Sequence, residues 1–167
     1  MVRALAKFPR GASIFVDANI FHMYLRGPRR IRDVCTAFLE RIERGEVEGY
    51  TSTLVLDELA YKLMLKRIEE LYRRNPLEVL RVKREIIAEV TPYVEEGINI
   101  VLGIEGLQIL SVELLHLEIF TECMKNYSLL PRDALHVAVM TSVNCRNIAS
   151  ADEDFDAVPS IVRWSPI

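Results

Sequence analysis

The order of apolar and polar positions predicts a chain in which short strands alternate with helices. Apolar-rich segments bounded by polar or small residues predict strands, and these cover residues 13–17, 49–52, 106–112, 147–151 and 161–164. Apolar side chains recurring at i, i+3, i+4 and i+7 predict helices, and these cover residues 31–44, 54–73, 77–90, 113–126 and 131–143. This alternation predicts an α/β sandwich with a mostly parallel central sheet.

Several helix ends carry residues that favour a start or a stop. Thr53 suits the N-cap of the helix 54–73, whose predicted apolar stripe consists of Leu56, Ala60, Met64, Ile68 and Leu71. Pro76 ends that helix and Pro92 is expected to end the next one, because the residue before a proline avoids the α region. Pro131 suits the first position of the last helix, which is apolar nearly all round and is therefore expected to lie deep in the core.

Length and composition fit one domain of a soluble protein. The chain has 167 residues, of which 50% are hydrophobic and 27% charged. Polar residues interrupt the most apolar stretch, 98–120, so that it does not predict a membrane span. With no segment resembling a signal peptide, the expected location is the cytoplasm, without a membrane partner. Three cysteines, Cys35, Cys123 and Cys145, fit no metal-ligand spacing and are expected to be reduced and buried.

The aspartates are distributed unevenly along the chain. The net charge is 21 − 24 = −3, but only seven of the acids are aspartates, and five of these are Asp17, Asp133, Asp152, Asp154 and Asp156. The short aspartate side chain is favoured at caps, turns and metal sites rather than on solvated helix faces. A functional cluster is therefore one explanation for their positions.

Four acids come at the ends of predicted elements. Asp17 ends the first strand, and Asp152 comes at the end of the strand 147–151. Asp133 and Glu58 lie in the first turns of two helices. Because ligand sites in open α/β sheets lie outside the carboxyl ends of the strands, these four side chains are expected to meet in one cleft.

Carboxylates at such close quarters repel and raise one another's pKa unless a cation neutralises them. Mg²⁺ and Mn²⁺ prefer oxygen ligands and keep several waters, which suits one or two carboxylates per ion together with phosphate oxygens. Two such ions about 4 Å apart would activate a water and stabilise the leaving oxygen of a phosphodiester. The cluster therefore predicts metal-assisted hydrolysis.

Each acid taken singly also has a structural interpretation. Asp17 can form an Asx-turn with Asn19, Glu58 can lie on a solvated helix face, and Asp133 is favoured near a helix N-terminus by the macrodipole alone. Residues 150–156 can form an acidic turn. Separate structural roles account for any one of these acids more readily than for all four together.

Four stretches of the chain resemble the PIN-domain ribonucleases, and among them the VapC-like toxins of toxin–antitoxin pairs. They are IFVDANIF (14–21), STLVLDELAYKL (52–63), LLPRDALHVAVM (129–140) and IASADEDFDAV (148–158). The resemblance covers nearly the whole chain. It implies a three-layer α/β sandwich with helices on both faces of the sheet, and it implies Mg²⁺ or Mn²⁺ as the cofactor.

The resemblance also assigns roles to matching positions. It implies that the catalytic, metal-binding acids are Asp17, Glu58, Asp133 and Asp152. It implies that Asp154 is a further metal ligand, and that Asn19 and Ser150 are auxiliary residues that orient the site. Asp156 is expected at the surface.

The implied function is a Mg²⁺- or Mn²⁺-dependent endoribonuclease that hydrolyses RNA phosphodiester bonds, acts as a homodimer and pairs with an antitoxin. Residues 66–105 look long for a compact toxin and are expected to be a helical insertion in a single domain, 1–167. An RNA-processing nuclease without an antitoxin, and a non-catalytic module that binds RNA or protein, therefore stay open as alternatives. An aspartyl-phosphate phosphatase is disfavoured, because Asn19 occupies the position where that chemistry wants a second aspartate.

Basic residues and one histidine also have two interpretations. Cations gather at 29–32 and 66–84, and they either contact RNA phosphates or form solvated helix faces paired with glutamates, which is the favoured interpretation. Tyr24 and Tyr61 either stack on bases or, as is favoured, pack partly buried. His136 shares a helix face with Asp133, and a hydrogen-bonded histidine within the apolar helix is favoured over a metal ligand or general base.

Overall fold

A computed structural model describes residues 3–167. Within them, six strands form one sheet in which every neighbouring pair is parallel, in the order β1-β6-β5-β2-β3-β4. The strands are β1 (Arg3–Ala4), β2 (Ser13–Val16), β3 (Glu48–Ser52), β4 (Leu107–Leu110), β5 (Asn147–Ala149) and β6 (Val162–Ser165). Five of them were predicted, and β1 was not.

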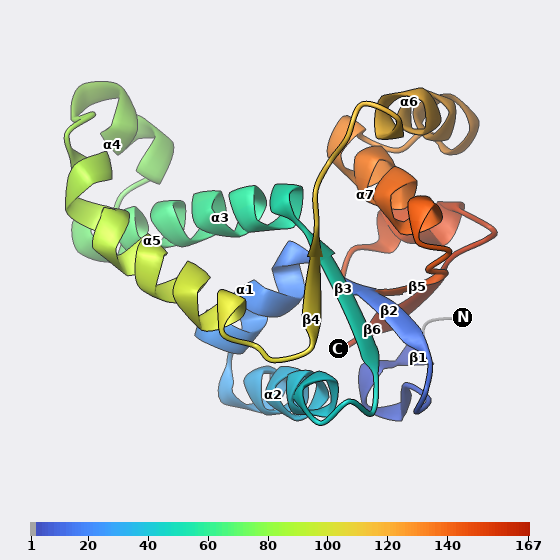
Figure 1. The fold of residues 1–167 in the computed structure, drawn as a ribbon. Helices are drawn as coiled ribbons and strands as arrows, with labels where there is room; N and C mark the ends of the chain where they lie inside the picture. The colour runs from blue at the N-terminus through green and yellow to red at the C-terminus, as the bar shows by residue number, and fades with distance from the viewer. Residues whose placement is uncertain (1–2) are drawn as a thin grey trace.

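Helices cover both faces of this sheet. They are α1 (Ala18–Arg26), α2 (Arg29–Glu43), α3 (Thr53–Tyr72), α4 (Pro76–Val82), α5 (Ile86–Leu102), α6 (His116–Tyr127) and α7 (Pro131–Ser142). Two short 3₁₀ helices, η1 (Leu5–Lys7) and η2 (Glu153–Ala157), complete the described chain. Figure 1 shows α1 to α5 on one side of the sheet and α6 with α7 on the other. The predicted three-layer α/β sandwich is confirmed.

The central strand β2 explains why the apolar run near the N-terminus predicted a strand so clearly. Ile14, Phe15 and Val16 are completely buried. Phe15 lies between Tyr50 of β3 and Ile148 of β5. A parallel strand with neighbours on both sides and helices on both faces needs apolar side chains at consecutive positions.

Helix α1 was not predicted. It follows β2 without a loop, because Asp17 has an extended backbone and accepts a hydrogen bond from Ala18 as the N-cap. Ala18, Ile20 and Phe21 are then completely buried. The sequence signal for this helix was an N-capping aspartate followed by apolar residues at helical spacing. It was missed because the same stretch resembles the end of a strand.

The prediction of one helix over 77–90 that ends before Pro92 was wrong. The break lies earlier, at Lys83, where α4 gives way to α5, and α5 then continues through Pro92. A proline inside a helix costs about 3 kcal/mol. Burial of Ile86, Val90 and Val101 offsets that cost as α5 packs against α3. The expectation that 66–105 is an insertion in a single domain stays a prediction.

The apolar stripe and the N-cap predicted for helix α3 agree with the structure only in part. Its N-cap is Ser52, which accepts from Val55, and not Thr53. The completely buried side chains are Val55, Leu59, Leu63 and Ile68, whereas Leu71 of the predicted stripe is 50% exposed. Of the predicted stripe, Ile68 is completely buried as expected, whereas Ala60 and Met64 line a groove between α3 and α5.

The C-terminal half agrees with the sequence analysis. Pro131 begins α7, and half of the residues of that helix are buried. Cys35, Cys123 and Cys145 are free and buried, as expected. Across residues 3–167, each helix falls short of the length or apolarity that crossing a bilayer requires.

Candidate active site

The order of the strands places a crevice between β2 and β5. From β2 the chain moves outward to β3 and then β4, whereas β5 and β6 lie on the other side of β2. Ligands bind outside the carboxyl ends of the strands at such a switch point. Asp17 directly follows β2 and Ser150 directly follows β5, so the fold delivers both side chains to this edge.

Asp17 is fixed by hydrogen bonds to both sides of the crevice. Its backbone N–H donates to the Ala149 carbonyl over 3.1 Å. Its Oδ1 accepts from the Ala18 N–H at 2.6 Å, and its Oδ2 accepts from the Ser150 hydroxyl at 2.7 Å and from the Asn19 amide. Burial raises the pKa of Asp17, and the charge of His136 and the Ser150 hydrogen bond oppose that effect.

Asn19 and Ser150 bind the two strand ends together. The Ser150 Oγ accepts from the Asn19 amide at 2.9 Å and from the Asp152 N–H at 3.0 Å. The Asn19 Oδ1 accepts from the Ala151 N–H at 3.1 Å. This network holds the segment after β5 beside Asp17 and connects it to the backbone of Asp152.

Glu58 and His136 meet between α3 and α7. The His136 Nε2 lies 3.0 Å from the Glu58 Oε1, and the two side chains are 1% and 12% exposed. Although burial raises the pKa of Glu58, the hydrogen bond and charge of His136, with Lys62 and Arg132, lower it below its ordinary value. Among residues 3–167, no hydrogen-bond partner faces the buried His136 Nδ1.

Three aspartates form the outer part of the site. Asp133 lies in the first turn of α7, and Asp152 caps η2 by accepting from the Asp154 N–H at 3.0 Å. Burial and the neighbouring Asp152 raise the pKa of Asp133 to about 6, and the charges of Asp17 and Glu58 add to this effect. All four predicted acids are therefore close enough to interact.

The potential ligand atoms fall into two groups. Asp17, Glu58 and His136 form one group, and Asp133, Asp152 and Asp154 form the other, each with ligand atoms within 4.8 Å of one another. Five of the six residues offer carboxylate oxygens, which Mg²⁺ and Mn²⁺ prefer. The raised pKa of Asp133 also indicates charges that a cation would neutralise. The residues present therefore fit a hard divalent cation.

The structure brings together every residue singled out for the site and adds His136. The favoured interpretation of that histidine, hydrogen-bonded within an apolar helix, agrees with the structure, but its partner is Glu58. Its position three residues after Asp133 was the only sequence signal. Asp156 lies outside the site and pairs with the buried Arg163 at 2.7 Å.

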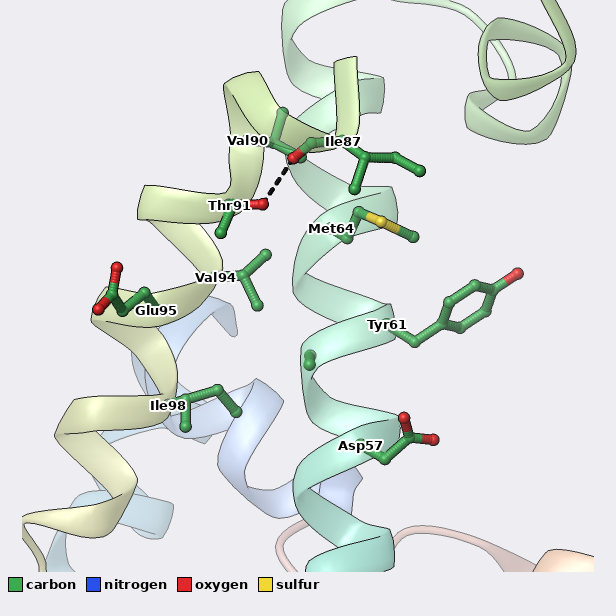
Figure 2. A pocket seen from close by; sticks show the side chains of 10 residues that line it. Asp57, Tyr61, Met64, Ile87, Val90, Thr91, Val94, Glu95 and Ile98 are labelled. Atoms are coloured by element: carbon green, nitrogen blue, oxygen red, sulfur yellow. Dashed lines mark hydrogen bonds between the residues drawn. The ribbon is translucent and has the colours of Figure 1, made fainter. Parts of the chain in front are cut away.

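A separate groove of about 600 Å³ lies between α3 and α5. Figure 2 shows Val94 and Ile98 on the side of α5 that faces α3, with Glu95 on the outer side of α5 and Asp57 on the outer side of α3. Tyr61, 43% exposed, lies along it. The four clustered acids do not line this groove, so it is a second surface feature.

The fold and this edge define a class of α/β proteins that have a group of carboxylates at the switch point of a parallel sheet. The PIN domain model matches residues 14–161. The chain therefore belongs to the PIN domain family. No match was found among curated proteins.

Solved structures share this fold at low sequence identity. A chain of the VapBC2 complex of Rickettsia felis, bound to a DNA fragment from its promoter, is 15% identical with a TM-score of 0.61; the match covers 92% of this chain and 98% of that one. VapC20 of Mycobacterium tuberculosis, a sarcin–ricin loop cleaving toxin, is 17% identical with a TM-score of 0.55, covering 87% and 95%. FitAcB of Neisseria gonorrhoeae is 17% identical with a TM-score of 0.54, covering 92% and 97%.

Proposed function

We propose that the protein is an endoribonuclease that hydrolyses RNA phosphodiester bonds with Mg²⁺ or Mn²⁺. The observation that carries this proposal is the meeting of four acids from four separate segments at one edge of the sheet. These acids are Asp17, Glu58, Asp133 and Asp152. Membership of the PIN domain family supports the same chemistry.

The side chains of the site have distinct proposed tasks. Asp17, Glu58, Asp133 and Asp152 hold the cation, and Asp154 is a further ligand at the exposed side. A bound divalent cation supplies Lewis-acid stabilisation of negative charge on phosphate oxygens. Asn19 and Ser150 keep Asp17 oriented, so that its carboxylate need not reorganise when the substrate arrives.

The test is cleavage of a mixed RNA pool. We expect cleavage with Mn²⁺ or Mg²⁺ and a return to background with excess EDTA, because the carboxylates alone would repel the phosphodiester. Equal cleavage in EDTA would contradict the proposal. A non-catalytic PIN module would bind RNA under both conditions without cleaving it.

We further propose that the nuclease is the toxin of a toxin–antitoxin pair and acts in the cytoplasm. Similar structures include VapBC and FitAcB proteins, and VapC20 is described as a toxin that cleaves the sarcin–ricin loop. The expected result is growth arrest when the protein is produced alone, and relief when the protein encoded beside it is produced too. An RNA-processing nuclease would leave growth unaffected by the neighbouring gene.

His136 is expected to position Glu58 for the cation. Replacing it by leucine removes the hydrogen bond to the Glu58 Oε1 but keeps the apolar packing of α7. Loss of a partner that orients a metal ligand weakens metal binding about 10- to 100-fold. Titration calorimetry with Mn²⁺ measures this directly, without substrate. His136→Gln, which retains a donor at a similar position, should restore most of the affinity; equal binding by the leucine variant would exclude the role.

We propose a homodimer through the groove between α3 and α5. A neighbouring hollow shares Tyr61, Met64 and Ile87 with this groove and contains Arg81 and Arg84. The combined surface is therefore apolar along the groove, with the acidic Asp57 and Glu95 at its two rims and the basic Arg81 and Arg84 in the neighbouring hollow. A two-fold axis would place an acidic rim of one copy against the basic hollow of the other.

The dimer can be tested at the middle of this surface. We expect Tyr61→Asp to shift the protein from dimer to monomer in sedimentation velocity at micromolar concentration, because it buries a charge in the interface. Leu117→Asp, at an equally exposed position on α6, is the matched control and should stay dimeric. Arg84→Glu should also weaken the dimer, and Glu95→Arg in the same chain should restore it. A wild-type monomer would refute the proposal.

A further inference from the structure

Two helices lead away from the acids, and both carry basic residues on the turns that follow. Asp17 caps α1, which continues with His22 and Arg26. Glu58 lies in α3, which continues with Lys62 and Lys66. Steps of four residues keep side chains on one face of a helix and advance about 6 Å each. We call His22, Arg26, Lys62 and Lys66 the basic path.

Lys62 is the member nearest the acids. Burial raises the pKa of Asp17, whereas the charge of His136 lowers it, and the Lys62 ammonium is among the other groups that lower it. Lys62 also contributes to the lowered pKa of Glu58. Nevertheless, it forms no ion pair with any carboxylate of residues 3–167. Its charge is therefore available to an anion that lies beside the acids.

A hollow of about 250 Å³ continues from Lys62. His22 and Lys66 line it, with Leu65, Glu69 and Pro76. Burial lowers the pKa of the half-buried His22, and the charges of Lys62, Lys66 and Arg26 lower it further, which shows that these cations converge. Lys66 pairs with Glu69 at 3.1 Å. An exposed pair of this kind is worth less than about 1 kcal/mol, so a phosphate can displace it.

The far end of the path reaches Tyr93 of α5. The Arg26 guanidinium lies 4.2 Å from the centre of the Tyr93 ring, and that of Arg67 lies 5.1 Å from it. These cation–π contacts hold both guanidinium groups in place. Other predicted cations are engaged elsewhere, because Lys83 pairs with Glu89 and Arg29 lies near Asp33. The favoured interpretation of paired helix faces thus holds for these cations, and also for Lys66 and Arg67, which pair with Glu69 and Glu70. Lys62 lies outside the two predicted clusters.

We propose that the basic path holds the phosphate groups of a single RNA strand whose neighbouring phosphodiester lies at the acids. This inference rests on the proposed function and adds where the substrate lies. The acids alone repel RNA, so binding requires cations beside them that contact phosphates irrespective of sequence. The path supplies such cations on two adjacent helices, starting next to Asp17 and Glu58.

The test measures binding of a short fluorescent single-stranded RNA by anisotropy, in EDTA and at low salt, so that cleavage does not interfere. The Lys62→Ala/Lys66→Ala double variant should bind about tenfold or more weakly. The slope of log K against log salt should fall by about 0.7 for each lysine removed. Lys62→Arg/Lys66→Arg should bind like the wild type, as should Lys7→Ala, the matched control on η1 at the opposite edge of the sheet.

Kinetics with Mn²⁺ separate this inference from the proposed function. Lys66→Ala should raise KM with kcat within about twofold, because it removes binding that ground and transition states share. If the lysine variants cleave RNA with unchanged affinity, salt slope and KM, the proposed role of the basic path is wrong, but the proposed nuclease activity is supported. Lysine-dependent RNA binding without any cleavage would support the path and refute the nuclease.

Discussion

Replacement of Asp17 by asparagine is expected to lower Mn²⁺-dependent RNA cleavage about a thousandfold or more, which corresponds to about 4 kcal/mol of lost transition-state stabilisation. Asparagine has the same shape and still offers Oδ1 to the Ala18 N–H. It lacks the negative charge, however, and its amide would face the Asn19 amide, which also donates. The side chain therefore loses its value as a cation ligand without opening a cavity. Rates on a defined RNA, with and without Mn²⁺, measure the effect.

Asp33→Asn is the matched control for Asp17→Asn. It makes the same chemical change on the exposed surface of α2, where Asp33 lies 4.0 Å from Arg29, and should cleave RNA at the wild-type rate. Circular dichroism and the Tm of both variants would show whether the fold is intact. A folded Asp17→Asn protein that cleaves as fast as the wild type would contradict the assignment of the acids.

Local patterns sufficed for every strand of the described sheet except the two-residue edge strand β1, but not for all of the helices that pack on it. Strand β2 was predictable because both of its faces are buried, which requires an uninterrupted apolar run. Helix α1 was missed because Asp17 acts as strand end, helix cap and site residue at once. The break between α4 and α5 was misplaced because packing on α3 outweighs the local effect of Pro92. Tertiary contacts decide such cases.

The acids were predictable for a topological reason. Parallel strands share one carboxyl edge, so residues directly after β2 and β5 come together even though 133 positions separate Asp17 from Ser150. The partners of Glu58 were not predictable in the same way. His136 reaches Glu58 only because α3 packs beside the start of α7. The position of Lys62 near Asp17 likewise depends on the packing of two separate elements. No local periodicity encodes these contacts.

Cation binding is expected to reverse the dependence of stability on pH. The Asp133 pKa of about 6 in the folded protein lies above the ordinary value of 3.8. A raised folded pKa means that the folded state binds the proton more tightly than the unfolded chain does. The resulting stability is fully present below about pH 4 and is lost as pH rises through 6. Asp17, whose pKa burial also raises, acts in the same direction. In EDTA, the Tm should therefore fall across this window.

With Mn²⁺ present, the same carboxylates must lose their protons before they can hold the cation. The increase in Tm caused by Mn²⁺ should therefore grow as pH rises through about 6, where Asp133 ionises, and should approach a constant value once it is fully charged. Asp133→Asn should flatten both curves, whereas Asp33→Asn should reproduce those of the wild type. Thermal melts at fixed ionic strength, with EDTA or Mn²⁺, give both curves from one preparation. If the Mn²⁺-induced increase in Tm did not change with pH, protons would not be competing with Mn²⁺ for the Asp133 carboxylate. Asp133 would then not be a ligand.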